Sequence, residues 1–310
     1  MAKKSKPQVW LEYALARILL SFLGMLPRRV AVSLMTSLAG LAYHLLGGLR
    51  HVAITNLNIA FPELSEADRN RLAKGSFRNL GRILGELSHF GRATAESIRK
   101  LVEFRMDPDV HEEIRKLRAE GRGVVLVSPH LGNWEVLVLG WAVFESPLCY
   151  LARPLDNPLV EQMTVDLRSR LGNRPINKTH SFMTAARILR REGQLGILAD
   201  VNAHPKEGVF VPFFGLPACT PSGGALLAMR TNAGILVMCG AWDEKKERYV
   251  AVHGRMVYPS KTGDRHRDIV ETTAAFTAEV EKLVRQFPDQ WMWIHKRWKT
   301  RPPGEPDIYN

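Results

Sequence analysis

Residues 123–135 read Gly-Val-Val-Leu-Val-Ser-Pro-His-Leu-Gly-Asn-Trp-Glu and contain the clearest structural signal in the chain. The apolar, β-branched run at 124–127 predicts a short buried strand, and the apolar run at 136–144 predicts the helix that follows it. Between them lie His130 and, five residues later, Glu135. Parallel α/β folds bind ligands beyond the carboxyl ends of their strands, so this junction is the first candidate for a functional site.

The pair of His130 and Glu135 suits general-base chemistry. Imidazole titrates close to neutral pH and can take a proton from a hydroxyl, while a carboxylate on its second ring nitrogen fixes the tautomer. Such a contact across about 1.4 helical turns requires His130 at or before the first turn. The competing interpretation is a histidine that caps a buried helix and a glutamate paired with an arginine. The same spacing, a histidine with an acid five residues later, occurs at His266 and Glu271. These two residues lie in a charged helix start and are interpreted as part of a solvent-exposed helix face.

Strand-like and helix-like segments alternate along most of the chain. Apolar runs predict buried strands at 124–127, 148–151, 195–198 and 235–239. Periodic segments predict helices at 157–171, 181–192, 223–232 and 266–286, after an earlier helix from Ser65 to about residue 90. The alternation favours an α/β fold with a mostly parallel central sheet flanked by helices, with residues 249–257 as an additional edge strand. We expect an apolar helical membrane anchor at 1–50 and one catalytic domain at 51–310.

The apolar N-terminus indicates that the protein associates with a membrane. Residues 9–26 are strongly apolar but carry Glu12 and Arg17, which suits a helix in the membrane interface. Residues 30–49 contain no Asp, Glu, Lys or Arg, and twenty such residues are long enough to span a bilayer. We expect a membrane-anchored or deeply monotopic protein that faces the cytoplasm. A buried helical hairpin is the alternative.

Charge and cysteine content limit the classes of binding partner and of catalytic site that the chain can have. A formal net charge of +12 indicates anionic partners: lipid headgroups, nucleic acid or an acidic carrier protein. Cys149, Cys219 and Cys239 have no Cys-x-x-Cys spacing and are interpreted as core residues in a reducing compartment. The chain has no Gly-x-Ser-x-Gly elbow and no glycine-rich phosphate loop, and no pattern predicts a metal.

Several blocks in a fixed order resemble one family. They are Asn-Leu-x-x-Ala-Phe-Pro-Glu at 56–63, His-Leu-Gly-Asn-Trp-Glu at 130–135, Ala-Arg-Pro-x-Asp-Asn-Pro at 152–158, Ala-Asp at 199–200, Gly-Val-Phe-Val-Pro-Phe-Phe-Gly at 208–215 and Gln-Trp-Met-Trp-Ile-His-Lys-Arg-Trp at 290–298. In this order the chain resembles the lipid A biosynthesis acyltransferases of the lauroyl/myristoyl type, within the lysophospholipid acyltransferase superfamily. The likeness covers nearly the whole chain.

The resemblance implies direct transfer of a fatty acyl chain from an acyl thioester, on acyl carrier protein or CoA, to a hydroxyl of a lipid A precursor. The acceptor is an anionic glycolipid, the thioester is a co-substrate rather than a cofactor, and no acyl-enzyme forms. His130 is implied as general base and Glu135 as its orienting acid. The expected location is the cytoplasmic face of the bacterial inner membrane.

Three further residues are implied in substrate binding: Arg153, Arg168 and Asp200. Their structural alternatives are an ion pair of Arg153 with Asp156, an exposed helix charge at Arg168, and an acid that caps the loop after its strand at Asp200. Phe213 and Phe214 either line an acyl pocket or pack the core.

The C-terminal aromatic and basic side chains predict an interfacial patch near lipid headgroups. They are Trp291, Trp293, Lys296, Arg297, Trp298 and Lys299. Nucleic-acid stacking is the competing interpretation and is disfavoured, because basic residues are otherwise scattered.

Two other functions fit the same residues. One is an acyltransferase that uses acyl-CoA and a glycerophospholipid or phosphatidylinositol mannoside acceptor. The other is a non-catalytic lipid-binding protein at the membrane, which the presence of both His130 and Glu135 disfavours.

Overall fold

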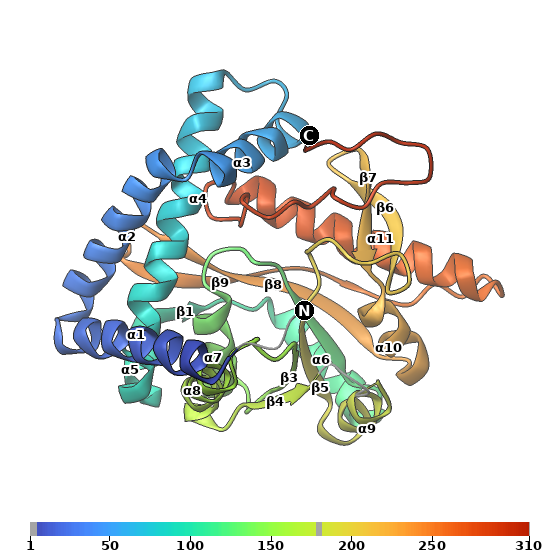
Figure 1. Cartoon of the computed structure of the whole chain (residues 1–310). Coiled ribbons are helices and arrows are strands. Elements are labelled where there is room, and N and C mark those ends of the chain that lie inside the picture. The colour runs from blue at the N-terminus through green and yellow to red at the C-terminus, as the bar shows by residue number, and fades with distance from the viewer. Residues whose placement is uncertain (1–4, 178–181, 310) are drawn as a thin grey trace.

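The computed structural model describes residues 5–177 and 182–309 of the chain. Within these residues a seven-stranded sheet runs in the order β1-β9-β8-β2-β5-β3-β4, and β6 and β7 form a separate antiparallel pair (Figure 1). The strands of the large sheet are β1 (Val102–Phe104), β2 (Val124–Ser128), β3 (Cys149–Ala152), β4 (Arg174–Asn177), β5 (Gln194–Leu198), β8 (Gly234–Asp243) and β9 (Arg248–Val257). The pair consists of β6 (Gly208–Phe213) and β7 (Leu216–Pro221).

The large sheet is mostly parallel, as predicted. Strands β2, β3, β4, β5 and β8 share one direction, whereas β9 and β1 run the opposite way. The four predicted buried strands correspond to β2, β3, β5 and β8. The additional strand predicted at 249–257 is β9, but it is not at the edge, because β1 pairs with its outer side.

Helices cover both faces of this sheet. They are α1 (Lys6–Met25), α2 (Arg28–Leu45), α3 (Gly47–Ala60), α4 (Glu66–Leu87), α5 (Ala95–Leu101), α6 (Pro108–Ala119), α7 (Trp134–Phe144), α8 (Pro158–Arg168), α9 (Phe182–Glu192), α10 (Gly223–Thr231) and α11 (Arg265–Gln286), with short 3₁₀ turns η1 (Phe90–Arg92) and η2 (Ser169–Leu171). The predicted helices correspond to α4, α7, α8 with η2, α9, α10 and α11. Residue 181, the first of one predicted helix, lies outside the described residues.

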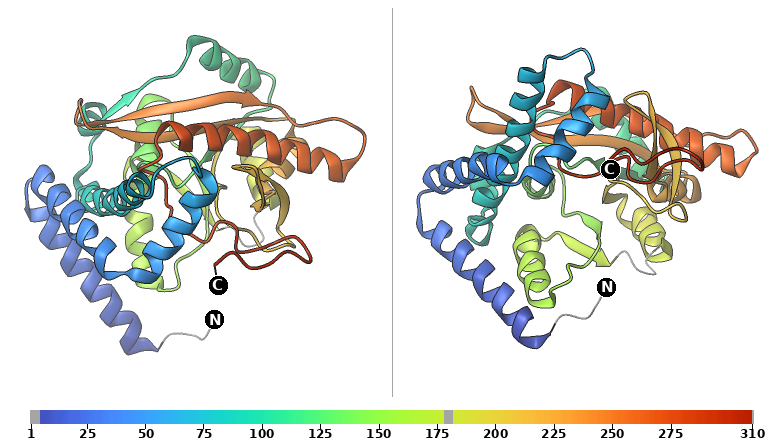
Figure 2. Two further views of the ribbon diagram at one scale, coloured as in Figure 1. Left: turned by 90° about the horizontal axis from the view of Figure 1, so that it is seen from above. Right: turned by 45° about the horizontal axis from the view of Figure 1, so that its top comes forward.

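Side chains of β2 alternate between two apolar clusters, one on each face of the sheet. Val125 and Val127 pack in the cluster that contains Phe276 of α11, whereas Val124 packs in the cluster that contains Trp141 of α7. Figure 2 shows α11 lying along β8 and β9 on one side, with α6 on the other. Because both faces are covered, β2 is apolar throughout its buried length instead of alternating with polar residues.

The predicted membrane span at 30–49 is not a single helix. The chain turns at Leu46, before Gly47 and Gly48, and α2 and α3 meet at 89°. Across residues 5–177 and 182–309 no single helix is long and apolar enough to cross a membrane; only the bent pair α2–α3 passes by length and composition. Instead α2 packs along α4, where a Cβ on Gly81 would lie 2.3 Å from the main-chain oxygen of Met35.

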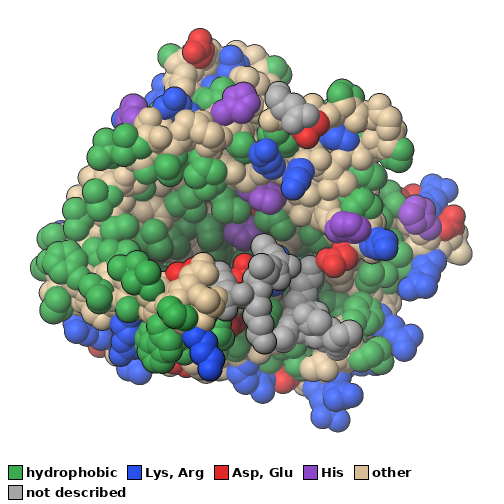
Figure 3. Space-filling model, in the orientation of Figure 1, with side chains coloured by type: hydrophobic (Ala, Val, Ile, Leu, Met, Phe, Trp, Pro, Cys, Tyr) green, Lys and Arg blue, Asp and Glu red, His purple; other side chains and the backbone are tan. Residues whose placement is uncertain are grey.

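Helices α1 and α2 nevertheless keep an apolar outer surface. In Figure 3 apolar side chains gather over the left side of the molecule, where Figure 1 places these two helices. We call this set the apolar helix surface: Trp10, Leu11, Leu15, Ile18, Leu19, Phe22, Met25, Val30, Leu34, Leu38, Leu41 and Leu45, all exposed.

Candidate active site

The chain between β2 and α7 holds His130 at the carboxyl edge of the sheet. Asn133 caps α7, because its side-chain oxygen accepts a hydrogen bond from the main-chain N–H of Val136. Gly132 docks this loop on β8: its φ is +62°, and a Cβ there would lie 2.1 Å from the main-chain oxygen of Gly240. Only glycine fits both requirements, so Gly132 fixes where His130 lies.

Asp200 is the carboxylate that contacts His130. Strands β2 and β5 pair in parallel, so their carboxyl ends, and the residues that follow, meet at one edge. The Nδ1 atom of His130 lies 2.7 Å from Oδ1 of Asp200, and the main-chain N–H of His130 donates to Oδ2 at 2.8 Å. The Nε1–H of Trp291 donates to the same Oδ2 at 2.7 Å. Asp200 therefore has both oxygens engaged, and it is only 3% exposed.

The electrostatics of this pair favour an ionised Asp200 beside a more basic imidazole. Burial by itself lowers the pKa of His130, but the charge and hydrogen bond of Asp200, helped by Glu135, raise it above its ordinary value. Burial by itself raises the pKa of Asp200, but its contacts with His130 and Trp291 bring it to about 2. A proton on Nδ1 donated to Asp200 leaves Nε2 with its lone pair, which is the form that a general base needs.

Glu135 is not the partner of His130, and this part of the prediction is wrong. Its carboxylate instead receives two hydrogen bonds from Arg168, Nε to Oε2 at 2.7 Å and an Nη to Oε1 at 2.5 Å. The indole N–H of Trp134 donates to it as well. No hydrogen bond or ion pair joins His130 to Glu135 in the part of the chain that the structure describes. The cause is position: Glu135 lies inside the first turn of α7 and contacts the end of α8.

Arg168 and Arg153 lie in different surroundings. Arg168 is mostly buried with Glu135, so it is not the exposed helix charge considered as an alternative. Burial by itself lowers the pKa of Arg168, but the Glu135 carboxylate raises it above its ordinary value. Arg153 follows β3 on the surface, with its side chain 3.6 Å from Asp156, as the structural alternative predicted.

The C-terminal segment is buried, so the predicted interfacial patch is wrong. Trp291, Trp293, Trp298 and Arg297 are at most 1% exposed, and only Lys296 and Lys299 of that set reach the surface. The segment is fixed to the site, because the main-chain N–H of Met292 donates to the main-chain oxygen of His130. Sequence reasoning mistook buried tryptophans for surface ones, since composition alone does not give burial.

His295 is a second histidine at the site that sequence reasoning did not single out. Its Nε2 accepts a hydrogen bond of 2.8 Å from the main-chain N–H of Asn202. Burial lowers the pKa of His295 to about 4, against a raising effect of Asp200. His295 is therefore neutral near pH 7 and holds the loop after Asp200. Its place in the block at 290–298 was the only available signal.

Other predicted residues belong to the core. Phe213 and Phe214 are buried against the C-terminal tryptophans, so both rings pack the core. The three cysteines are buried and free, as predicted.

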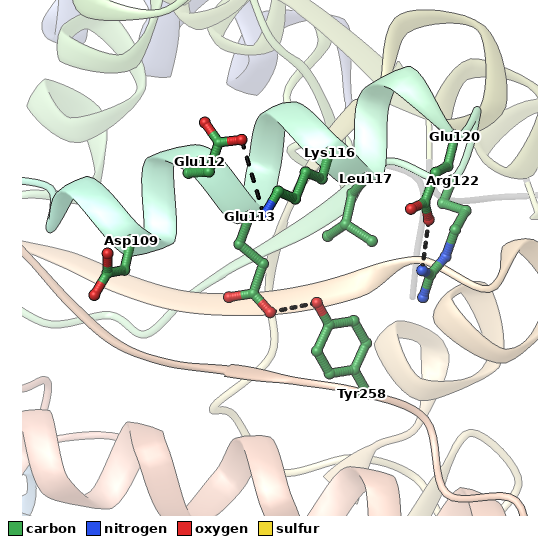
Figure 4. A pocket seen from close by; sticks show the side chains of 8 residues that line it. All are labelled: Asp109, Glu112, Glu113, Lys116, Leu117, Glu120, Arg122 and Tyr258. Atoms are coloured by element: carbon green, nitrogen blue, oxygen red, sulfur yellow. Dashed lines mark hydrogen bonds and ion pairs between the residues drawn. The ribbon is translucent and has the colours of Figure 1, made fainter.

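A hollow opens on the face of the molecule that Figure 3 draws. Figure 3 shows it bordered on one side by the apolar helix surface, with histidine and acidic side chains inside it. A cavity of about 420 Å³ lies elsewhere, between α6 and Tyr258, and its walls include Asp109, Glu112, Glu113 and Glu120 (Figure 4). Neither His130 nor Asp200 lines that cavity, and its acidic walls disfavour anionic ligands. The cluster around His130, not this cavity, is the candidate active site.

Comparisons with known proteins agree with the resemblance. Residues 2–300 match the family model described as bacterial lipid A biosynthesis acyltransferase. The chain is similar to the lipid A biosynthesis lauroyltransferase of Escherichia coli (strain K12), at 29% identity over 98% of this chain and 96% of the relative. It is also similar to the palmitoleoyltransferase of that organism, at 25% identity over 98% and 95%. A third relative is its lipid A biosynthesis myristoyltransferase, at 25% identity over 84% and 78%.

Proposed function

The chain belongs to the bacterial lipid A biosynthesis acyltransferase family and is thus an acyltransferase, and from this premise we propose how its site works. It moves a fatty acyl chain from an acyl thioester to a hydroxyl of a lipid A precursor. His130 is the general base, and Asp200, in place of Glu135, is the acid that orients it. The observation that carries this assignment is the 2.7 Å contact between His130 Nδ1 and Asp200 Oδ1.

The reaction follows from that contact. Nε2 of His130 takes the proton of the acceptor hydroxyl as its oxygen forms a bond to the thioester carbonyl carbon. Asp200 stabilises the imidazolium that results. The tetrahedral intermediate then expels the thiolate, the carbon–sulfur bond breaks, and the thiolate takes the proton from His130. Direct attack needs no acyl-enzyme, because a thioester is already activated.

Arg168 and Glu135 are proposed to act as one unit beside His130. The two-point pair fixes the guanidinium of Arg168, and its remaining N–H groups are suited to a carbonyl oxygen that gains charge, or to a phosphate. Glu135 is thus a positioning residue for Arg168. Arg153, on the surface after β3, is proposed to meet a phosphate of the anionic acceptor.

The apolar helix surface supports attachment to a membrane. We propose that α1 and α2 lie in the cytoplasmic leaflet of the inner membrane with these side chains among the lipid tails, so that the protein is monotopic. The hollow beside this surface would then receive a lipid acceptor from the bilayer (Figure 3). The division into an anchor at 1–50 and a catalytic domain at 51–310 remains a prediction.

Purified protein tests the proposal with a radiolabelled acyl donor and a Kdo-bearing lipid A precursor. We expect transfer of label to the precursor, and loss of at least about 10²-fold in kcat for His130→Ala, the lower end of general-base contributions. A panel with glycerophospholipid and phosphatidylinositol mannoside acceptors checks the acceptor class. Transfer rates near wild type for His130→Ala would contradict the proposed role of His130 as general base.

A further inference from the structure

His295 lies beside the catalytic pair, on the C-terminal segment that packs against the loops after β2 and β5. The main-chain N–H of Met292, three residues earlier, donates to the main-chain oxygen of His130. On the other side, Nε2 of His295 accepts the main-chain N–H of Asn202, two residues after Asp200. The charges of Asp200 and of His130 both act on the pKa of His295. The ring is therefore a neighbour of the groups that react.

The hydrogen bond from Asn202 determines which nitrogen of the His295 ring carries the proton. A ring nitrogen that accepts an N–H must keep its lone pair, so Nε2 is unprotonated. Burial lowers the pKa of His295 to about 4, so near pH 7 the ring holds a single proton. That proton is on Nδ1, and His295 is a neutral hydrogen-bond donor at this atom.

Nδ1 of His295 has no hydrogen-bond partner within residues 5–177 and 182–309. The side chain is only partly buried, and Nδ1 is not one of the enclosed polar atoms that lack a partner in that part of the chain. His253 differs, because its Nε2 also accepts a main-chain N–H but its Nδ1 contacts the main-chain oxygen of Gly254 at 2.8 Å. His295 thus offers an open N–H next to the reacting groups.

We propose that Nδ1–H of His295 donates a hydrogen bond to the carbonyl oxygen of the acyl thioester as that oxygen gains negative charge; this deepens, and rests on, the acyl transfer proposed above. When the hydroxyl oxygen bonds to the carbonyl carbon, one electron pair of the C=O bond moves to the carbonyl oxygen. The pair returns when the carbon–sulfur bond breaks. His295 keeps its proton throughout and acts as a fixed donor, while His130 takes and returns the proton of the hydroxyl.

The two histidines have surroundings that suit these separate roles. Asp200 raises the pKa of His130, which makes it the stronger base, whereas burial lowers the pKa of His295. A neutral His295 donates without placing a positive charge beside His130, and such a charge would weaken the base. Environments that move two neighbouring pKa values apart are typical of paired groups that divide acid–base work.

Two substitutions at His295 separate donation to the substrate from anchoring of the loop. The amide of asparagine lies near the position of Nδ1, so His295→Asn keeps a donor there but is too short to accept from Asn202. The longer glutamine places its amide oxygen near the position of Nε2, so His295→Gln keeps that acceptor and offers no donor at Nδ1. A role in anchoring alone makes glutamine the better replacement, whereas the proposed donor makes asparagine the better one.

The measurements are thermal melting and the kinetics of acyl transfer to the Kdo-bearing precursor. We expect His295→Gln to melt near wild type and to lose about 10²–10³-fold in kcat, the scale of one oxyanion donor. Its KM should stay within about twofold of wild type, because the bond strengthens only in the transition state. His295→Asn should keep kcat within about tenfold of wild type, since it loses only the hydrogen bond to the loop. The matched control is His253→Gln, which should keep kcat near wild type.

Nitrogen-15 NMR of the His295 ring checks the donor without catalysis, and we expect a protonated Nδ1 and an unprotonated Nε2 at pH 7. A protonated Nε2, a His295→Gln variant with wild-type kcat, or a kcat lower in His295→Asn than in His295→Gln would overturn the inference. His130→Ala separates it from the proposed function. An inactive His130→Ala with a fully active His295→Gln refutes the His295 donor alone, whereas an active His130→Ala refutes the chemistry on which the donor rests.

Discussion

Glu135 and Arg168 are joined at two points, while His130, five residues before Glu135, is held by an acid seventy residues away in sequence. A buried pair broken on one side leaves an uncompensated charge, which costs about 3–5 kcal/mol. We expect Glu135→Ala to destabilise the protein by roughly 3 kcal/mol in denaturant unfolding, by the same principle. The control is Asp156→Ala, whose exposed pair with Arg153 is worth about 0–1 kcal/mol. Similar losses in both variants would contradict the account.

The pKa of His130 predicts the acid limb of the pH profile. The base acts only when neutral, so kcat/KM falls as pH drops through its pKa. Asp200 raises this pKa above 6.5, which places the acid limb above that pH. Asp200→Asn removes the raising charge and should move the limb to lower pH, whereas Asp156→Asn should not move it. An acid limb at the same pH in Asp200→Asn as in wild type would show that the pKa of His130 does not set this limb.

Trp291 donates a hydrogen bond to Oδ2 of Asp200, the oxygen that also accepts from the main-chain N–H of His130. Trp291→Phe keeps an aromatic ring but removes the N–H donor, so we expect the pKa of Asp200 to rise and kcat to fall about tenfold, since a lost hydrogen bond to a charged group costs about 1.5–3 kcal/mol. KM should change little, because the ring of Trp291 is buried in the core. The matched variant Trp293→Phe, whose indole donates to the main-chain oxygen of Pro288 instead, should keep kcat near wild type if it folds as well. Equal effects of the two would indicate a purely structural role.

Gly132 sets the position of His130, and Gly132→Ala is expected to unfold the loop or the protein. The added Cβ meets the main-chain oxygen of Gly240 and the residue keeps a positive φ. Gly223→Ala is the control, because nothing lies within 4 Å of its Cβ and its φ is not positive. We expect the first variant to lose activity and melt at lower temperature, and the second to melt within a few degrees of wild type. Normal melting and activity of Gly132→Ala would contradict the loop geometry.

Attachment through α1 predicts weaker membrane binding when its outer side chains become polar. Leu15, Ile18 and Phe22 are exposed on α1, and full burial of each is worth about 1.5–3 kcal/mol. Their combined replacement by glutamine should reduce sedimentation with anionic liposomes at least tenfold. Tyr258→Gln, at an exposed aromatic side chain beside the acidic cavity, should not. Unchanged sedimentation of the α1 variant would place the membrane contact elsewhere.

Local patterns predicted the elements, because apolar runs and helical spacing depend on neighbours in sequence. Strands β2, β3, β5 and β8 were found in this way, whereas the three-residue β1 is too short to leave a pattern. The sequence contains a local indication of the helix break at Leu46, the pair Gly47–Gly48. The prediction of one membrane span rested instead on the apolar length of the segment.

The site was predicted only in part. His130, Arg168 and Asp200, which the resemblance implied as catalytic and substrate-binding residues, lie in one region, but the pairing of His130 with Asp200 depends on strand order, which brings β5 beside β2. Nearness in sequence favoured Glu135 as the partner of His130, and the fold turned that side chain toward α8. The burial of Trp291 depends on packing against distant strands, so composition misplaced it on the surface.

Acyl transfer by Asp200→Asn, compared with Glu135→Gln, tests the central assignment most directly. Asparagine keeps the shape but cannot stabilise the imidazolium or enforce the tautomer, so we expect kcat to fall by about 10⁴-fold, the scale of the same replacement in a catalytic triad. Glu135→Gln should cost far less, because it keeps one oxygen acceptor for Arg168. A kcat for Asp200→Asn within tenfold of wild type, together with an inactive but folded Glu135→Gln, would contradict the account.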